Sequence, residues 1–328
     1  MYVVTGGAGF IGSNVLAALE DRGCEDLVVV DRLRDGNKWR NIAHRELADI
    51  VEPVRIFDFL EQHRTKIKAI LHMGAVSSTT EKDVDKILTN NFDYSIALLR
   101  WCAMHGIRLI YASSGATYGD GSNGFDDDAS IAHLAKMRPL NAYGWSKHLF
   151  DRRVARRLAQ KKKMPPQWVG LKFFNVYGPN EYHKGQQSSV VSQVYPHAAQ
   201  NTHFNLFRSH NPAYKDGGQL RDFVWVGDVV DVIMWLLDNP QISGLYNLGT
   251  GKARSFFDLA AAAYRALGLE PNIRYIDTPV PIRDKYQYFT EAKMDRLRAA
   301  GYTKPFTGVE EGVTRYVKDF LSQSDPYR

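Results

Sequence analysis

A glycine-rich turn close to residue 6 constrains the fold more than any other feature of the sequence. The apolar run 2–5 leads straight into Gly6, Gly9 and Gly12, and an amphipathic helical pattern follows at once. In a strand, turn and helix of this kind, the first glycine permits a sharp turn. The second lets backbone N–H groups approach a pyrophosphate, and the third lets helix and strand pack closely. We therefore predict that this turn, with a helix N-terminus facing the anion, binds a dinucleotide.

Short β-rich runs alternate with longer helical patterns through the first half of the chain. The runs that read as strands cover residues 2–5, 27–30, 69–73, 108–113 and 168–174. Because strands that alternate with helices form parallel sheets with crossover helices, we predict an α/β Rossmann fold with a doubly wound parallel sheet.

The pattern of the sequence changes after residue 174. There the regular alternation of strand-like and helical segments stops, and Gly, Pro, Asn and His become frequent. We assign 1–174 to a dinucleotide-binding domain and expect a strand at 222–226, a helix at 228–237 and a strand at 245–248 to return to it. Residues 175–221 and 249–328 are then a smaller, interleaved substrate-binding lobe.

Charge and cysteine content indicate which ligands and which cellular compartment to expect. The 328 residues carry a formal net charge of +6, which favours anionic ligands without choosing among them. The most basic stretch, 152–163, has helical spacing without interleaved aromatic residues, so we interpret it as a solvated helix face and expect no nucleic-acid partner. Cys24 and Cys102 have neither metal-ligand nor disulfide spacing, which predicts no metal site and a reducing cytoplasm. No cleavable apolar leader and no membrane-spanning run is found, so we expect no membrane association.

An acidic residue and three cations follow the second predicted strand. Asp31 lies about twenty residues after the glycine turn, where a carboxylate hydrogen-bonds the adenosine ribose and favours NAD. Arg32, Arg34 and Lys38 come directly afterwards and favour NADP by neutralising a 2′-phosphate. We predict NADP, with NAD as the alternative.

Ser114, Tyr143 and Lys147 form a candidate catalytic set. Tyr143 and Lys147 are spaced Y-x-x-x-K, which on a helix puts a phenol and an ammonium one turn apart on one face. A cation and a positive nicotinamide ring stabilise phenolate and lower the tyrosine pKa from about 10, so that the phenol can exchange a proton. Ser114 ends a predicted strand and is suited to hydrogen-bond a substrate hydroxyl beside Tyr143.

With these motifs in this order, the chain resembles the extended short-chain dehydrogenases that act on nucleotide sugars. More narrowly, it resembles the ADP-L-glycero-D-manno-heptose 6-epimerase family over essentially its whole length. The segments that carry the resemblance are 5–14 (TGGAGFIGSN), 77–81 (SSTTE), 111–119 (YASSGATYG), 174–179 (FNVYGP), 183–185 (HKG), 221–224 (RDFV), 286–290 (YQYFT) and 297–302 (LRAAGY). SSTTE, HKG and the last two segments carry most of the narrower resemblance.

The resemblance implies an epimerase that acts on ADP-heptose with bound NADP. It would oxidise C6 to a transient ketone and reduce it from the opposite face, which requires proton transfer on both sides of the ketone. Lys184 matches the second catalytic position of the family, and Lys147 the residue that holds the nicotinamide ribose.

The resemblance also assigns binding positions. Those that match cofactor contacts are Gly6, Gly9, Phe10, Ile11, Gly12, Asp31, Arg32, Lys38, Asp49, Gly74, Ala75, Val76, Ser77, Asn90, Tyr143, Lys147 and Val176. Those that match substrate contacts are Ser78, Asn175, Lys184, Ser209, Arg221 and Tyr286. A homo-oligomer in the cytoplasm is also implied, with association through the helices around 87–102 and 143–158.

The chain departs from the family pattern in the region expected to bind the sugar. Gln186 and Gln193 replace a serine and a histidine, Arg208 replaces an acid, and residues 211–219 form a longer insertion. Another nucleotide-sugar epimerase, a reductase or a dehydratase of the superfamily is therefore the alternative, although Gly115 stands where a dehydratase carries an acid. A catalytically silent dinucleotide sensor is a further alternative, and retention of Ser114 and Tyr143 argues against it.

Overall fold

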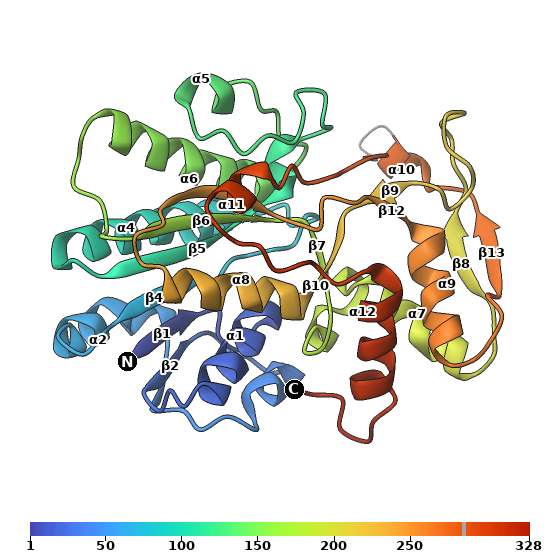
Figure 1. Ribbon diagram of the computed structural model, residues 1–328, viewed down its shortest axis with the longest axis horizontal. Helices are drawn as coiled ribbons and strands as arrows, with labels where there is room; N and C mark the ends of the chain where they lie inside the picture. Colours follow the sequence, from blue (N-terminus) through green and yellow to red (C-terminus); the bar gives the residue numbers. More distant parts are fainter. Residues whose placement is uncertain (284–286) are drawn as a thin grey trace.

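The larger part of the protein is built on one seven-stranded parallel sheet. The computed structural model describes residues 1–283 and 287–328 and is shown in Figure 1. The strands follow the order β11-β6-β5-β4-β1-β2-β3, and every neighbouring pair is parallel. They are β1 (Tyr2–Thr5), β2 (Leu27–Val30), β3 (Asp49–Val51), β4 (Ala69–His72), β5 (Arg108–Ser114), β6 (Trp168–Phe173) and β11 (Gly244–Leu248). The predicted doubly wound α/β fold is confirmed.

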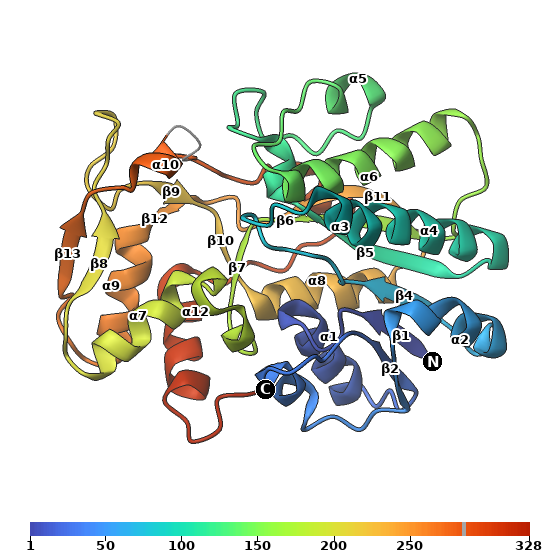
Figure 2. The same cartoon turned by 180° about the vertical axis from the view of Figure 1, so that it is seen from behind.

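Helices cover both faces of this sheet. Neighbouring strand residues point to opposite faces, so Val4 packs in one apolar cluster and Val3 in another. The helices on the first face are α1 (Phe10–Asp21), α8 (Val226–Asp238) and α11 (Asp295–Ala299). Those on the second face, seen in Figure 2, are α2 (Ile56–His63), α3 (Val84–Leu88), α4 (Tyr94–His105) and α6 (Ala142–Ala159). Burial on both faces explains why the strands are almost continuously apolar.

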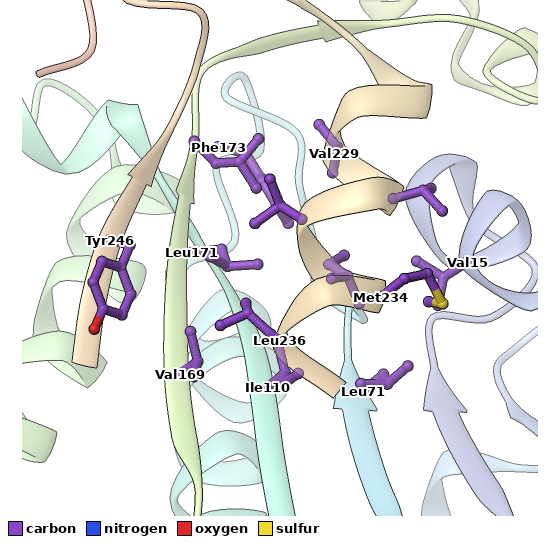
Figure 3. Packing of buried hydrophobic residues seen from close by; sticks show 14 of the residues in the cluster. Val15, Leu71, Ile110, Val169, Leu171, Phe173, Val229, Met234, Leu236 and Tyr246 are labelled. Atoms are coloured by element: carbon purple, nitrogen blue, oxygen red, sulfur yellow. The ribbon is translucent and has the colours of Figure 1, made fainter. Parts of the chain in front are cut away.

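The first face is closed mainly by α8. Figure 3 shows Leu236 of this helix near Ile110 and Leu171 of the sheet, and Met234 beside Val15 of α1. All five side chains are buried, so this helix is part of the core although it lies more than 200 residues from β1 in sequence. The basic stretch after Asp151 instead places Arg152, Arg153 and Arg156 in solvent, as predicted.

A smaller lobe packs beside the carboxyl ends of the strands. Its helices are α7 (Val190–Ala199), α9 (Phe256–Ala266), α10 (Val280–Arg283) and α12 (Val309–Arg315), and α5 (Ile131–Leu134) lies apart above α6. Three two-stranded sheets accompany them, formed by β7 (Asn175–Tyr177) with β10 (Phe223–Trp225), β9 (Leu220–Arg221) with β12 (Arg254–Ser255), and β8 (Phe204–Phe207) with β13 (Ile273–Ile276). The short helical turns are η1 (Asn37–Ile42), η2 (Pro53–Arg55), η3 (Thr89–Asp93), η4 (Gly115–Tyr118), η5 (Tyr182–Gln187) and η6 (Tyr316–Leu321).

The strand expected at 222–226 does not join the main sheet. Residues 223–225 form β10, which pairs in parallel with β7 because the backbone N–H of Asn175 donates to the carbonyl of Asp222 at 3.0 Å and fixes the register. The expected helix and the last expected strand do reach the main sheet, as α8 and β11.

The glycine turn packs backbone against backbone next to the sheet. Gly6 has a φ of +66°, and a Cβ there would lie 2.6 Å from the backbone of Gly74. A Cβ on Gly12 would lie 2.2 Å from the carbonyl oxygen of Gly6. Both positions therefore exclude side chains for steric reasons that involve only backbone atoms.

Gly12→Ala should destabilise the cofactor-free protein by about 1–3 kcal/mol or more, because the new methyl group meets a backbone oxygen that cannot rotate away. Gly36→Ala is the matched control, since its Cβ would have open space and its φ of −95° suits alanine. Urea unfolding measures both variants. Equal stabilities for the two would contradict the close packing of Gly12.

Candidate active site

A cleft of about 840 Å³ lies at the carboxyl ends of β1, β2, β4 and β5. The chain runs from β1 outward to β3 on one side and from β4 outward to β6 on the other, so the direction reverses between β1 and β4. In open α/β sheets, ligands bind at such a reversal. The predicted site residues that line the cleft are Gly6, Gly9, Phe10, Ile11, Gly12, Asp31, Arg32, Lys38, Gly74, Ala75, Val76, Ser77, Ser78, Asn90, Ser114, Tyr143, Lys147, Val176 and Lys184.

The structure places other predicted residues away from the lining of this cleft. Asp49 is exposed at the start of β3, and Asn175 is exposed at the start of β7. Ser209 and Arg221 lie in the smaller lobe, where the Ser209 hydroxyl donates to the carbonyl of Asn211 at 2.7 Å and the Arg221 guanidinium lies 5.5 Å from the ring centre of Phe256. Tyr286 lies outside the described residues.

The start of α1 offers backbone donors to an anion. Gly9 is the N-cap residue, and because it has no side chain, no capping group occupies the N–H groups at the helix start. Phe10, Ile11 and Gly12 open the helix and line the cleft. A helix N-terminus of this kind stabilises phosphate, so the residues present fit the pyrophosphate of a dinucleotide.

Asp31 and the cations beside it form one hydrogen-bonded group. The carboxylate of Asp31 accepts from the backbone N–H of Ala8 at 3.0 Å and from the Lys38 ammonium at 2.5 Å. Arg32 donates to the side-chain oxygen of Asn90 at 3.0 Å. Both cations and the carboxylate thus face the same end of the cleft, where an adenosine ribose or its phosphate would lie.

The catalytic set comes together from β5 and α6. Asn141 caps α6 by accepting the Gly144 N–H at 2.8 Å, which puts Tyr143 in the first helical turn. One turn later, the Lys147 ammonium donates to the carbonyl of Ala112 at 2.8 Å. Ser114 ends β5, and its hydroxyl hydrogen-bonds Tyr143, which opposes the effect of burial on the tyrosine pKa.

Burial shifts both members of the Tyr–Lys pair. It raises the pKa of Tyr143, against the partly compensating bond to Ser114. It lowers the pKa of Lys147 to about 8, while the carboxylate of Asp151 opposes that shift. The expected lowering of the tyrosine pKa is therefore not produced by the surroundings of Tyr143 in the chain. It requires the further positive charge of a bound nicotinamide ring, which the sequence argument also invoked.

Lys184 approaches the cleft from the smaller lobe. It lies in η5, with its ammonium 5.4 Å from the ring centre of Phe10. Burial lowers its pKa, and Glu181 opposes the shift. Glu181 itself is held by the N–H and hydroxyl of Ser189, at 2.5 and 2.6 Å. A lysine with a lowered pKa that is part-buried at a cleft wall is suited to proton transfer.

A buried ion pair behind the catalytic set was missed by the sequence reasoning. Asp151 and Lys172 form an ion pair at 3.0 Å, and both side chains are almost fully buried. Asp151 also accepts from the hydroxyl of Ser113 at 2.7 Å, and Lys172 donates to Thr117 at 2.6 Å. The pair therefore ties together β5, β6, η4 and α6. One signal was available, since Asp151 falls one turn after Lys147 on the same helix face.

Asn91 is a second residue that the sequence reasoning missed. Its buried side chain accepts from the N–H of Val76 at 2.8 Å and donates to the carbonyl of the same residue at 3.0 Å. It also donates to the hydroxyl of Ser146, which in turn donates to the carbonyl of Tyr143. Asn91 thereby fixes the wall at 74–78 relative to the helix of the Tyr–Lys pair. The sequence reasoning had named its neighbour Asn90 as a cofactor contact and had not considered Asn91.

This fold and its cleft are those of a dinucleotide-dependent enzyme. Residues 2–249 match the model of the NAD dependent epimerase/dehydratase family. The chain is 49% identical to an ADP-L-glycero-D-manno-heptose-6-epimerase of Nitratidesulfovibrio vulgaris (strain DP4) and 46% identical to a protein of the same name from Fusobacterium nucleatum, each over the full length of both chains.

Solved structures of two nucleotide-sugar epimerases superpose on nearly the whole chain. The Helicobacter pylori ADP-L-glycero-D-manno-heptose-6-epimerase superposes with a TM-score of 0.78 and 26% identity, covering 98% of this chain and 96% of that one. A Thermus thermophilus UDP-glucose 4-epimerase, solved in complex with NAD, superposes with a TM-score of 0.76 and 26% identity, covering 98% and 99%. The chain belongs to the NAD dependent epimerase/dehydratase family, and its cofactor is a nicotinamide dinucleotide.

The pKa of Lys147 predicts how turnover depends on pH. Because burial lowers this pKa to about 8, the ammonium is present below that pH and is lost as the pH rises through it, so activity should fall on the alkaline side. Asp151→Asn removes the charge that raises the pKa, so the fall should begin at a lower pH in that variant. Steady-state rates between pH 6 and about 10 measure both, and thermal unfolding checks that the variant is folded. Coincident profiles would contradict this role of Asp151.

Proposed function

We propose that the chain interconverts ADP-D-glycero-D-manno-heptose and ADP-L-glycero-D-manno-heptose by transient oxidation at C6. The observation that carries the proposal is that Tyr143 and Lys184, from different lobes, line one cleft together with the glycine turn. An enzyme that inverts a carbinol centre needs proton donors and acceptors on two sides of the intermediate ketone, and two residues that reach one cleft from different lobes are candidates for these roles. The full-length identity of 46–49% to proteins named for this reaction supports the substrate.

Each catalytic residue then has a defined task. When bound, the dinucleotide would supply hydride transfer from and back to C6 and a positive charge near Tyr143. Tyr143 takes or gives the proton of the C6 hydroxyl on one side, and Ser114 hydrogen-bonds the same oxygen. Lys147 holds the ribose and keeps a cation near the phenol. Lys184 serves the opposite side, where its lowered pKa allows it to donate and recover a proton.

We propose NADP as the cofactor, with Arg32 and Lys38 as the groups that bind the 2′-phosphate. Because Lys38 already neutralises Asp31, at 2.5 Å, the carboxylate repels a phosphate less than it would alone. Arg32 is exposed and is positioned by Asn90, so its remaining N–H groups are available to a phosphate.

We also propose that the larger domain and the smaller lobe bind different ligands. Residues 1–174 with 222–248 bind the dinucleotide, whereas 175–221 and 249–328 receive the nucleotide sugar, with Ser78, Asn175, Ser209, Arg221 and Tyr286 as candidate contacts. The departures in this lobe are peripheral to the cleft. Arg208 is exposed and pairs with Asp277 at 3.3 Å, and Gln193 donates to the carbonyl of Ser188 at 2.8 Å. They therefore affect the lobe surface more than the catalytic set.

We further propose a homo-oligomer that works in the cytoplasm. Met104 of α4, together with Trp145 and Leu158 of α6, exposes apolar surface on the two helices named for association. Cys24 and Cys102 are both free thiols, as expected of a protein in a reducing compartment. Within 1–283 and 287–328, no helix has the length and apolar character needed to cross a bilayer.

The function is tested by incubating the purified holoprotein with ADP-D-glycero-D-manno-heptose and following the configuration at C6 by proton NMR. Conversion to the L-glycero epimer without net formation of reduced cofactor is expected. A 4-keto-6-deoxy product, or no conversion with the cofactor still bound, would overturn the proposal and direct attention to other nucleotide sugars.

Tyr143→Phe should lower turnover by about 10²–10⁴-fold, because the phenol proton is lost from the acid/base step while the ring remains. Lys184→Met should give a loss of similar size. Cofactor affinity of Tyr143→Phe, measured by fluorescence titration, should change little. Tyr195→Phe is the control, since that hydroxyl bonds Ser322 in the smaller lobe at 3.4 Å. Full activity of Tyr143→Phe would refute its assignment.

Arg32→Ala should weaken NADP binding by about tenfold or more and leave NAD binding nearly unchanged, because a charge-assisted bond to the 2′-phosphate is lost. Arg22→Ala is the matched control, an exposed arginine that pairs with Asp238 and lies outside the cleft lining. Isothermal titration with both dinucleotides gives the ratio of the NADP affinity to the NAD affinity. A ratio unaffected by Arg32→Ala would favour NAD and a structural role for Arg32.

A further inference from the structure

Residues 325–328 return from the smaller lobe to the dinucleotide-binding domain. They follow η6 and reach η1, beside which the C label stands in Figure 1. Tyr327 is half-buried and lines the cleft, as do Lys38 of η1 and Lys184 of η5. No motif in the sequence pointed to this segment.

One set of contacts joins the segment to η1 and the residues after it. The carboxylate of Asp325 lies 3.1 Å from the ring Nε2 of His44 and 4.0 Å from the guanidinium of Arg40. The same guanidinium stacks over the ring of Tyr327 at 4.5 Å. Arg40 is therefore held by a charge and by an aromatic face from one short stretch of chain.

A second set joins the segment to η5 and α1. The hydroxyl of Tyr182 donates to the carbonyl of Pro326 at 2.8 Å, and its ring meets that of Tyr327 edge to face with centroids 5.2 Å apart. The backbone N–H of Arg328 donates to the side-chain oxygen of Asn180 at 2.9 Å. Tyr182 directly precedes His183 and Lys184, so the segment contacts the loop that carries the second proposed catalytic lysine.

Buried amides connect the same loops underneath. The Asn41 side chain donates to the carbonyls of Ala8 and Asn180, at 2.9 and 3.0 Å, and lies 3.1 Å from the ring nitrogen of His183. Asn180 in turn donates to the hydroxyl of Ser13 at 3.0 Å. The glycine turn, η1 and η5 are therefore connected by one network of buried polar side chains. Residues 325–328 pack next to this network.

We propose that Asp325–Arg328 is a strap that holds η1 and η5 together over the bound dinucleotide, with Tyr327 as a further cofactor-binding residue. Because Tyr327 stands between the loops of Lys38 and Lys184, its ring packs against the adenosine diphosphate part of the cofactor. An enzyme that oxidises and then reduces one substrate needs its cofactor to stay in place between the two half-reactions, and the strap slows its release. The inference rests on the proposed dinucleotide site and not on the identity of the sugar.

The test measures how fast the dinucleotide leaves the protein. NADPH-loaded protein is mixed rapidly with excess NADP, and loss of bound-cofactor fluorescence gives the dissociation rate. Tyr327→Ala should raise this rate at least tenfold, and Tyr327→Phe should keep most of the retention because the ring remains. Asp325→Ala should raise the rate less. The matched control is Asp238→Ala, which removes an exposed ion pair with Arg22 away from the cleft.

A second measurement separates a binding role from a merely structural one. The unfolding temperature of the cofactor-free Tyr327→Ala protein should fall only slightly, because the lost contacts are those of a half-buried ring with Arg40 and Tyr182, whereas the stabilisation by added NADPH should shrink. An unchanged dissociation rate, or a fall in unfolding temperature of equal size with and without NADPH, would overturn the strap. A parent protein that binds the dinucleotide but converts no ADP-heptose would refute the proposed function and leave the strap standing. One that binds no dinucleotide would refute both.

Discussion

The close approach of the glycine turn to the end of β4 is the constraint on which the rest of the site depends. Gly6 lies against the backbone of Gly74, and Gly12 lies against the carbonyl of Gly6, with no room for a side chain at either place. This contact sets the distance between α1 and the sheet and opens the cleft where the chain changes direction. The site that fits a pyrophosphate therefore follows from backbone sterics.

Buried charge gives the catalytic set its chemical character. Lys147 is withdrawn from water and has a lowered pKa, yet the carboxylate of Asp151 opposes the loss of its proton. Asp151 is itself paired with the buried Lys172, so this carboxylate has a countercharge in the core. Such a network is costly to disrupt, because removing one member leaves another charge buried without a partner. It also joins the carboxyl ends of β5 and β6 next to the cleft.

The two lobes meet through loops, and the two proposed proton-transfer groups come from opposite sides of this junction. Tyr143 belongs to α6 of the larger domain, whereas Lys184 belongs to η5. Their separation is controlled by polar side chains such as Asn41 and Asn180, which bond backbone carbonyls and hydroxyls across the junction. The junction between the two proposed groups therefore depends on contacts between segments more than 100 residues apart in sequence, and these contacts are short-range and directional.

The sequence by itself determined the parallel sheet, the glycine turn and the pairing of Tyr143 with Lys147, because these depend on local periodicity and steric demand. It could not predict that β10 pairs with β7 outside the main sheet, or that Asp49 lies away from the cleft. The sequence also did not predict the roles of Asp151, Lys172, Asn91 and Tyr327, and the reason is the same for all four. Their roles arise from neighbours distant in the chain, and only tertiary packing decides which buried polar groups meet and which charges lose their water.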